Sequence, residues 1–194
     1  MEKGDYLDVI LRSKKTIFST KDVALLWGDA NMDAAGVRLN YYVKHGKLIR
    51  LRRGLYAKDA NYDKYELGTN ILRPSYVSFE TVLGAAGITF QLYGQIFVAS
   101  YVKRNLICGG QEYSFRTIKN TILVNPQGID QSGEYSIATK ERAFLDTIYR
   151  SKEYHFDNLT PLDWDKVFEI VPIYDNKKMA KKVGEYYKNF QANK

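Results

Sequence analysis

Apolar residues in the first part of the chain follow a helical spacing and then a strand-like one. Within residues 6–14 and again within residues 33–44, apolar residues recur at intervals of three and four, which predicts a short helix in each segment. Just before the apolar run of residues 23–27, Ser19 and Asp22 have the spacing of a capping box, in which each side chain accepts a hydrogen bond from the other residue's backbone N–H. The three predicted helices lie at residues 6–14, 23–27 and 33–44, and Gly28 and Gly46 end the second and the third.

Two short apolar runs after these helices predict a β-hairpin. The runs are residues 48–51 and 55–57, and Gly54 between them supplies the positive φ that a tight turn needs. Three helices followed by a hairpin is the element order of a winged helix-turn-helix, which binds double-stranded DNA. The predicted organisation is a winged helix-turn-helix DNA-binding domain at residues 1–60, a polar linker and helix at residues 61–73, and a second domain at residues 74–194.

The second domain alternates between helical and strand-like patterns, so the chain as a whole is predicted to be an α+β protein. Ser78 can cap a helix at residues 79–86, Thr139 can cap another after it, and two further helices are expected near the C-terminus. Gly109-Gly110 marks a hairpin turn between two strands. The predicted strands, which form a small antiparallel sheet, lie at residues 95–101, 105–108, 111–117, 121–124 and 135–138.

The positive charge of the chain is concentrated in the predicted DNA-binding domain. The 194 residues carry a net charge of +7, of which residues 1–60 contribute +5. From the last turn of the third helix through the hairpin, the chain carries basic residues with no acidic residue between them. A winged helix contacts phosphates with this part of its structure. The alternative interpretation of so short a basic run is a solvated surface. The position of the run in the wing favours phosphate binding. The predicted phosphate-binding residues are Lys21, Lys47, Arg50, Arg52 and Arg53.

The third predicted helix has two different faces. At about 100° per residue, Ala35, Leu39, Tyr42 and Val43 fall on one side, which we expect to face the core. The opposite side mixes hydrogen-bonding, small apolar and cationic side chains, as the reading of base edges in the major groove requires, although an ordinary exposed face has a similar composition. Asp33, on this side, is expected to cap the helix or to lie at a base edge. The predicted base-reading residues are Ala34, Val37, Arg38, Asn40, Tyr41 and Lys44.

Three short motifs occur along the chain in a fixed order. Residues 42–57 end in a basic pair, a glycine, an apolar residue and a tyrosine. Residues 74–87 begin with Pro-Ser-Tyr and continue into a predicted helix. Residues 138–146 contain the run Lys-Glu-Arg-Ala-Phe-Leu-Asp. The first motif resembles the wing of the AbiEi-type antitoxins, transcriptional regulators of type IV toxin–antitoxin systems, and the other two resemble segments that follow in that family.

This resemblance implies an N-terminal winged helix joined to a mixed α/β antitoxin domain. It implies a protein that is encoded beside a nucleotidyltransferase-like toxin, represses its own toxin–antitoxin operon and counteracts that toxin. Double-stranded operator DNA is the expected partner of a monomer or weak dimer, and direct contact with the toxin is left open. The alternative functions are a stand-alone winged-helix transcriptional regulator and a protein-interaction module without a toxin partner.

No recognisable catalytic motif is present, so we expect no enzyme activity, no cofactor and no metal. His45 and His155 are the two histidines and Cys108 is the single cysteine, too few for a structural zinc site. The sequence has no phosphate-binding loop, dinucleotide fingerprint or nucleophile elbow. Because no apolar run is long enough to span a membrane and the charged start lacks the apolar core of a secretory signal, the cytoplasm is the expected location.

Three charged clusters in the second domain allow a functional and a structural interpretation. For Glu141, Arg142 and Asp146 we favour a structural ion-pair network that anchors their helix. The lysines within residues 177–182 would form either a second nucleic-acid patch or, as we favour, the solvated face of an amphipathic helix. The acids of Asp163-Trp164-Asp165 are expected to open a helix, where negative charge suits the helix dipole.

Overall fold

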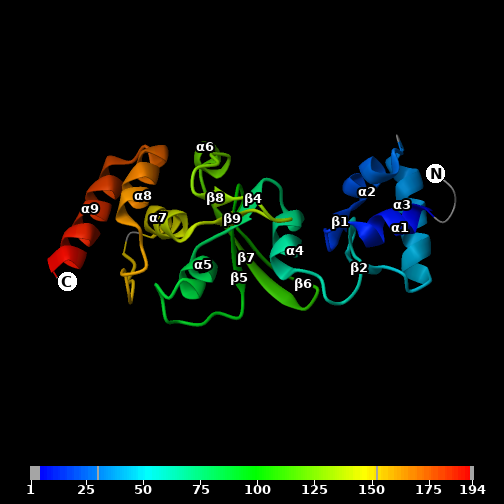
Figure 1. Cartoon of the computed structure of the whole chain (residues 1–194), viewed down its shortest axis with the longest axis horizontal. Coiled ribbons are helices and arrows are strands. Elements are labelled where there is room, and N and C mark those ends of the chain that lie inside the picture. Colours follow the sequence, from blue (N-terminus) through cyan, green and yellow to red (C-terminus); the bar gives the residue numbers. More distant parts are fainter. Residues whose placement is uncertain (1–4, 30, 152, 193–194) are drawn as a thin grey trace. The chain divides into compact units, whose positions relative to one another are not determined.

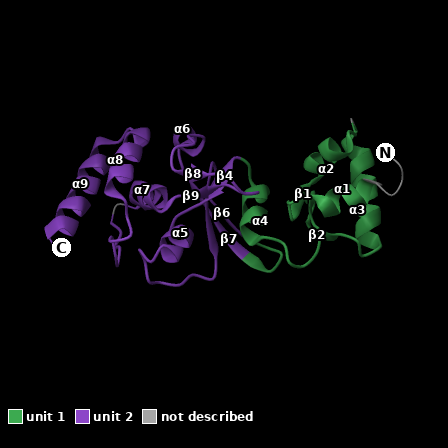
Figure 2. Cartoon of the chain, viewed as in Figure 1, with its two compact units in different colours: residues 1–73, 107–111 green, residues 74–106, 112–194 purple. Residues whose placement is uncertain are grey.

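The computed structural model describes residues 5–29, 31–151 and 153–192, and it divides into two compact units (Figure 2). Unit 1 consists of residues 1–73 and 107–111, and unit 2 consists of residues 74–106 and 112–194. Both contain helices and strands, which confirms the α+β class. Within the described ranges, no helix has the length and apolar character needed to cross a membrane.

Unit 1 contains the winged helix-turn-helix that the sequence predicts, together with a further strand and helix (Figure 1). The added strand, β1, pairs with β3, so that the sheet order is β1-β3-β2 with antiparallel neighbours. β1 has only three residues, too few for an alternating pattern to reveal it. The elements are α1 (Asp5–Arg12), β1 (Ile17–Ser19), α2 (Thr20–Trp27), α3 (Met32–Lys44), β2 (Ile49–Arg52), β3 (Leu55–Ala57) and α4 (Lys64–Ile71).

The boundaries of α2 follow from its capping residues, as predicted. The Ser19 hydroxyl accepts from the Asp22 N–H at 3.1 Å, the Asp22 carboxylate accepts from the Ser19 N–H at 3.0 Å, and Gly28 ends the helix at φ 66°. Asp22 also pairs with Arg73 at 3.2 Å. Burial by itself raises the pKa of Asp22, but the hydrogen bonds from Ser19 and the nearby Arg73 outweigh it and lower the pKa below the usual 3.8.

We expect Asp22→Ala to destabilise unit 1 by about 1 kcal/mol at neutral pH, since the loss of a capping side chain typically costs that much. Because the folded-state pKa is lowered, this contribution is present above pH 3.8 and is lost as the pH falls through the folded pKa. Denaturant unfolding, followed by Trp27 fluorescence in a Trp164→Phe background, measures the difference. The control, Asp8→Ala, removes an exposed partner of Arg12 and is expected to cost less than about 0.5 kcal/mol. Equal losses in both variants would contradict the capping role.

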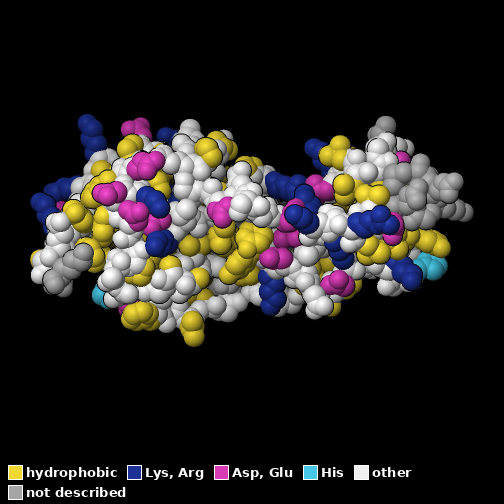
Figure 3. All heavy atoms as spheres, viewed as in Figure 1, with side chains coloured by type: hydrophobic (Ala, Val, Ile, Leu, Met, Phe, Trp, Pro, Cys, Tyr) yellow, Lys and Arg dark blue, Asp and Glu magenta, His cyan; other side chains and the backbone are white. Residues whose placement is uncertain are grey.

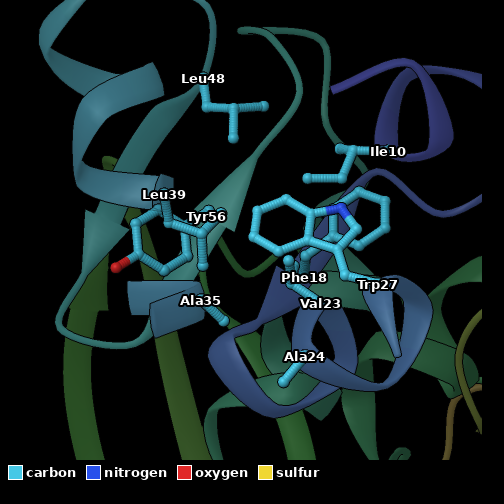
Figure 4. Packing of buried hydrophobic residues seen from close by; sticks show 9 residues of the cluster. All are labelled: Ile10, Phe18, Val23, Ala24, Trp27, Ala35, Leu39, Leu48 and Tyr56. Atoms are coloured by element: carbon cyan, nitrogen blue, oxygen red, sulfur yellow. The ribbon is translucent and has the colours of Figure 1, made fainter. Parts of the chain in front are cut away.

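The core of unit 1 lies between the three N-terminal helices and the sheet (Figure 4). Buried side chains from α1, α2, α3 and β3 point toward one another there. From α3, Ala35 and Leu39 are fully buried, and Tyr42 and Val43 pack against the cluster. The predicted core face of this helix is therefore confirmed, and its opposite face points outward.

Residues 61–73, predicted as a linker that merges into a helix, are anchored to the strand region of unit 1. Asp63 caps α4 by accepting from the N–H groups of Tyr65 and Glu66, at 2.7 and 3.1 Å. The buried Glu66 carboxylate accepts from the N–H and the hydroxyl of Thr16, at 2.8 and 2.6 Å. Thr16 immediately precedes β1, so α4 is tied to the sheet of the winged helix.

The sheet of unit 2 contains six strands in the order β6-β7-β5-β4-β9-β8, and two of its pairings are parallel. β6 and β7 form the predicted hairpin around Gly109-Gly110, whose φ angles are both positive. β7 rather than β6 lies beside β5 and runs parallel to it, and β4 runs parallel to β9. The strands are β4 (Ser75–Val77), β5 (Ile96–Ser100), β6 (Arg104–Cys108), β7 (Gln111–Thr117), β8 (Ile129–Asp130) and β9 (Ile137–Ala138).

The parallel pairings of β5 with β7 and of β4 with β9 correct the antiparallel sheet expected for the second domain, and the structure also corrects one predicted strand and one predicted cap. Residues 121–124 lie in a single helical turn, α6, and not in a strand, because a short apolar run does not distinguish the two. Ser78 does not cap α5; its hydroxyl donates to Asp146 at 2.7 Å instead, and Phe79 precedes the helix. The helices of unit 2 are α5 (Glu80–Ala85), α6 (Asn120–Leu123), α7 (Lys140–Arg150), α8 (Trp164–Ile170), the 3₁₀ turn η1 (Val171–Tyr174) and α9 (Lys177–Ala192).

α7, α8 and α9 pack together through aromatic side chains. α7 begins after Thr139, whose hydroxyl accepts from the N–H of Arg142 at 3.2 Å, as predicted. The ring of Phe144 in α7 lies 5.9 Å from that of Trp164 in α8 and 5.8 Å from that of Tyr186 in α9. The two predicted C-terminal helices are confirmed, and each contributes a ring to the core of unit 2.

Arg142 and Asp146 form a fully buried ion pair in unit 2, with Nε 3.3 Å from the carboxylate. Glu141, also buried, accepts from the N–H of Asp163 at the start of α8, at 3.2 Å. Because hydroxyls and backbone carbonyls surround the ion pair, the geometry matches the structural interpretation. The carboxylate accepts from the hydroxyls of Tyr76, Ser78 and Tyr174, and the guanidinium donates to the Tyr76 hydroxyl and to the carbonyls of Ile122 and Gln127.

Candidate nucleic-acid interface

The outward face of α3 forms an exposed strip, which we call the α3 strip: Ala34, Val37, Asn40, Tyr41 and Lys44. Ala34 is half-buried and the other four are exposed, Val37 to 70% and Tyr41 to 57%. The helical spacing of these residues places them along one side of α3, opposite Ala35 and Leu39. The strip contains five of the six residues predicted to read bases.

The sixth of these residues, Arg38, is held apart from the α3 strip. Its guanidinium forms an ion pair with Asp29 and lies 4.2 Å from the centroid of the Tyr6 ring and 5.8 Å from that of Trp27. The backbone N–H of Asp29 donates to the carbonyl of Ala24 at 2.9 Å, which fixes the turn after α2. Arg38 thus fastens α3 to α1 and to that turn.

The wing is the short hairpin formed by β2 and β3. Gly54 occupies its turn at φ 79°, as predicted. β3 is buried in the middle of the sheet, whereas β2 is the outer strand and is mostly exposed. Arg50 and Arg52 on β2 and Arg53 in the turn are therefore all exposed. The register shifts between Arg50 and Arg52, which pair with Tyr56 and Leu55.

The cations near the strip and the wing differ from the other arginines of unit 1. Arg12, Arg38 and Arg73 are each paired with an aspartate. Figure 3 shows Lys and Arg side chains on the visible face of unit 1. Exposed cations without a carboxylate partner retain their full attraction for phosphate. Among the residues that the structure describes, no carboxylate lies within ion-pair distance of Lys21, Lys44, Lys47, Arg50, Arg52 or Arg53.

A hollow of about 690 Å³ lies between α1 and α3, beside the α3 strip. Sequence reasoning missed it, because it depends on how the two helices cross and not on the pattern of either one. The rings of Tyr41 and His45 lie 4.0 Å apart, and His45 Nδ1–H donates to the Tyr41 carbonyl at 2.8 Å. His45 thereby supports the ring of Tyr41. The lining residues include Tyr6, Leu7, Val37, Tyr41, His45 and Lys47.

The lysines of α9 lie on the surface of unit 2. Lys177, Lys178 and Lys181 are exposed, whereas Met179 and Val183 on the same helix are buried. This alternation is that of an amphipathic helix, and it is compatible both with the solvated basic face that the sequence favoured and with a second nucleic-acid patch.

In the described ranges, no three His, Cys, Asp or Glu side chains gather as metal ligands would. Asp163 caps α8 by accepting from the N–H of Lys166 at 3.3 Å, as its predicted helix-opening role requires. Cys108 is buried, and burial raises the pKa of its thiol, so that little reactive thiolate is present at neutral pH.

A protein-family model matches the N-terminal part of this chain. The family model described as "Transcriptional regulator, AbiEi antitoxin" matches residues 5–57, which span α1 to β3. Among curated proteins, no significant match to the chain is found. The matched residues include the wing segment, 42–57, whose sequence carries the resemblance described above, and they confirm it there. The winged helix of this chain, residues 5–57, is thus similar to the AbiEi antitoxin family of transcriptional regulators.

Proposed function

We propose that unit 1 binds double-stranded operator DNA, with α3 in the major groove and the wing against the phosphate backbone. The observation that carries the proposal is the exposed α3 strip beside cations that have no carboxylate partner. The major groove of B-DNA admits an α-helix, and base edges there are distinguishable. In this arrangement the α3 strip faces the bases, and the phosphate contacts come from Lys21, Lys47, Arg50, Arg52 and Arg53.

The five phosphate-binding cations imply a defined dependence on salt. Each neutralised phosphate contributes about −0.9 to the slope of log K against log salt concentration. If each cation contacts one phosphate, the slope is about −4 to −5. Because phosphate contacts carry no sequence information, this slope applies to any duplex, whereas the α3 strip distinguishes the operator.

We further propose that the chain acts as an antitoxin, which represses its own toxin–antitoxin operon and counteracts a nucleotidyltransferase-type toxin. The family of the winged helix supports this role. The other two motifs of the resemblance also meet in the core of unit 2, where Tyr76 and Ser78 of one donate to Asp146 of the other, at 3.0 and 2.7 Å. The motifs thus share one packing feature, as expected if unit 2 is the antitoxin domain.

A gel shift with the DNA upstream of this chain's own gene tests the DNA-binding proposal. We expect a retarded band that survives an excess of unrelated duplex, and a salt slope of about −4 to −5. A band that unrelated duplex removes completely would argue against an operator in that region. If no duplex is retarded at low salt, the winged helix is a scaffold and the interaction-module alternative holds.

Co-expression tests the antitoxin proposal separately. A nucleotidyltransferase-like gene next to this one is expected to arrest growth when expressed alone and to be tolerated when this chain is present. Continued arrest in the presence of the chain would contradict the antitoxin role and leave the stand-alone regulator.

A further inference from the structure

We infer that the α3 strip reads an A·T-rich half-site, with Asn40 on an adenine and apolar side chains on thymine methyl groups. The inference rests on the DNA binding proposed above and adds the class of base pair that is recognised. In the major groove, adenine presents N7 and the N6 amino group, and thymine presents O4 and a methyl group. Guanine presents two acceptors, N7 and O6. The outcome depends on which side chains of α3 can reach these groups.

Arg38 is the residue of α3 best suited to guanine, and the structure holds it elsewhere. Guanine is most often recognised by a cation that donates to both O6 and N7. The Arg38 guanidinium instead pairs with Asp29 and lies over the Tyr6 ring, 4.2 Å from its centroid. To reach a base edge, it would have to give up both contacts. The main guanine-reading group of the helix is therefore committed to the fold of unit 1.

The uncharged residues of the α3 strip suit A·T pairs. The amide of Asn40, which is exposed, can accept from adenine N6 and donate to N7. Ala34 and Val37 precede it at intervals of three residues, so the three side chains follow one another along the strip. Tyr41 adds an aromatic ring that packs against His45. These apolar groups gain most by contact with a thymine methyl, which only A·T pairs present.

The charged residues on this side of α3 lie at its two ends. Asp33 is in the first turn, where negative charge stabilises the N-terminus of the helix. Lys44 is the last residue of α3, next to Lys47 and the wing, and so lies at the boundary between bases and phosphates. The centre of the strip, formed by Val37 and Asn40, carries no charge. The central base pairs are therefore read by an amide and by apolar groups.

Selection by the full chain from duplexes with a random core tests the inference. We expect the enriched half-site to contain adjacent A·T pairs, and we expect binding about 5- to 150-fold weaker when one of them is replaced by G·C. The selected duplex is then measured with uracil in place of thymine, which removes only the methyl group. Each contacted methyl is expected to account for about a fourfold loss, as for one buried CH₂ group.

Variants connect these effects to individual side chains. Val37→Ala is expected to reduce the sensitivity to uracil by about fourfold, the share of the one methyl that Val37 contacts, and Asn40→Ala to weaken binding to the selected duplex more than binding to random duplexes. Arg38→Met keeps an unbranched chain over the Tyr6 ring and is expected to leave the selected motif unchanged. Leu11→Ala, which removes a 47% exposed apolar side chain of α1, is the matched control and is expected to change neither readout.

The possible outcomes separate this inference from the proposed function. Two results overturn the inference while DNA binding stands. One is a selected half-site dominated by G·C pairs, and the other is a guanine that the unmodified chain selects and the Arg38→Met variant does not. Salt-dependent binding without any enriched motif overturns base reading by α3. If no duplex is bound at low salt, DNA binding itself fails and the inference fails with it.

Discussion

Asp146→Ala is expected to lower the free energy of unfolding of unit 2 by about 3–5 kcal/mol, because it leaves the buried charge of Arg142 without its counter-ion. Both side chains are fully buried, with Nε 3.3 Å from the carboxylate. The carboxylate also accepts from three hydroxyls, which lose their acceptor in the variant. Arg142→Ala is expected to have an effect of similar size, because it leaves the Asp146 charge unpaired.

Denaturant unfolding, followed by the fluorescence of the buried Trp164 of unit 2 in a Trp27→Phe background, measures these losses. Arg150→Ala, at the exposed end of the same helix, is the control and is expected to change the free energy of unfolding by less than about 0.5 kcal/mol. Because the two charges act as a pair, the double variant is expected to be more stable than the sum of the single losses implies. A loss below about 1 kcal/mol in Asp146→Ala would show that the network does not hold unit 2 together.

Arg52→Ala combined with Arg53→Ala is expected to weaken binding to every DNA duplex and to flatten the salt slope by about two, one for each lost phosphate contact. At about 0.1 M salt this corresponds to a loss of roughly tenfold to a hundredfold in affinity. The preference for the operator over a random duplex is expected to persist, because the contacts proposed for the wing are to phosphates, which carry no sequence information. Fluorescence anisotropy with both duplexes over a range of salt concentrations gives the affinities and the slopes.

Arg12→Ala is the matched control for this pair. It also removes a cation from unit 1, but one that already has Asp8 as its partner, at 2.8 Å. We expect its salt slope to match that of the unmodified chain. If the double variant keeps the original slope as well, the wing does not contact phosphates.

Sequence reasoning was accurate where a feature depends on neighbouring residues. The capping box of Ser19 and Asp22 and the left-handed Gly28 set the ends of α2 by hydrogen bonds within a few residues. The two faces of α3 follow from its period, so Leu39 is buried and Asn40 is exposed as expected. The same holds for the hairpin turn at Gly54. These features place the strip and the wing, and with them most of the candidate site.

The errors concern residues whose partners are distant in the sequence. The carbonyl of Ile122 accepts from Arg142, and the turn around it is helical although its apolar run suggested a strand. Ser78 donates to Asp146, 68 residues further along the chain, and so does not cap the helix that follows it. Local propensity cannot reveal such competition, because the stronger partner is brought in only by the fold.

By itself, the sequence determined that the chain begins with a winged helix and that its cations lie beside an outward helical face, since capping, helical period and charge are local properties. The tertiary structure alone decided which side chains of that face remain free. In the sequence, Arg38 lies at the edge of the outward face that carries Asn40, and both were predicted to read bases, yet α1 and the turn after α2 bring Tyr6 and Asp29 to Arg38. Arg38 is held by a carboxylate and a ring, whereas Asn40 is exposed. That difference changes the expected base preference of the helix.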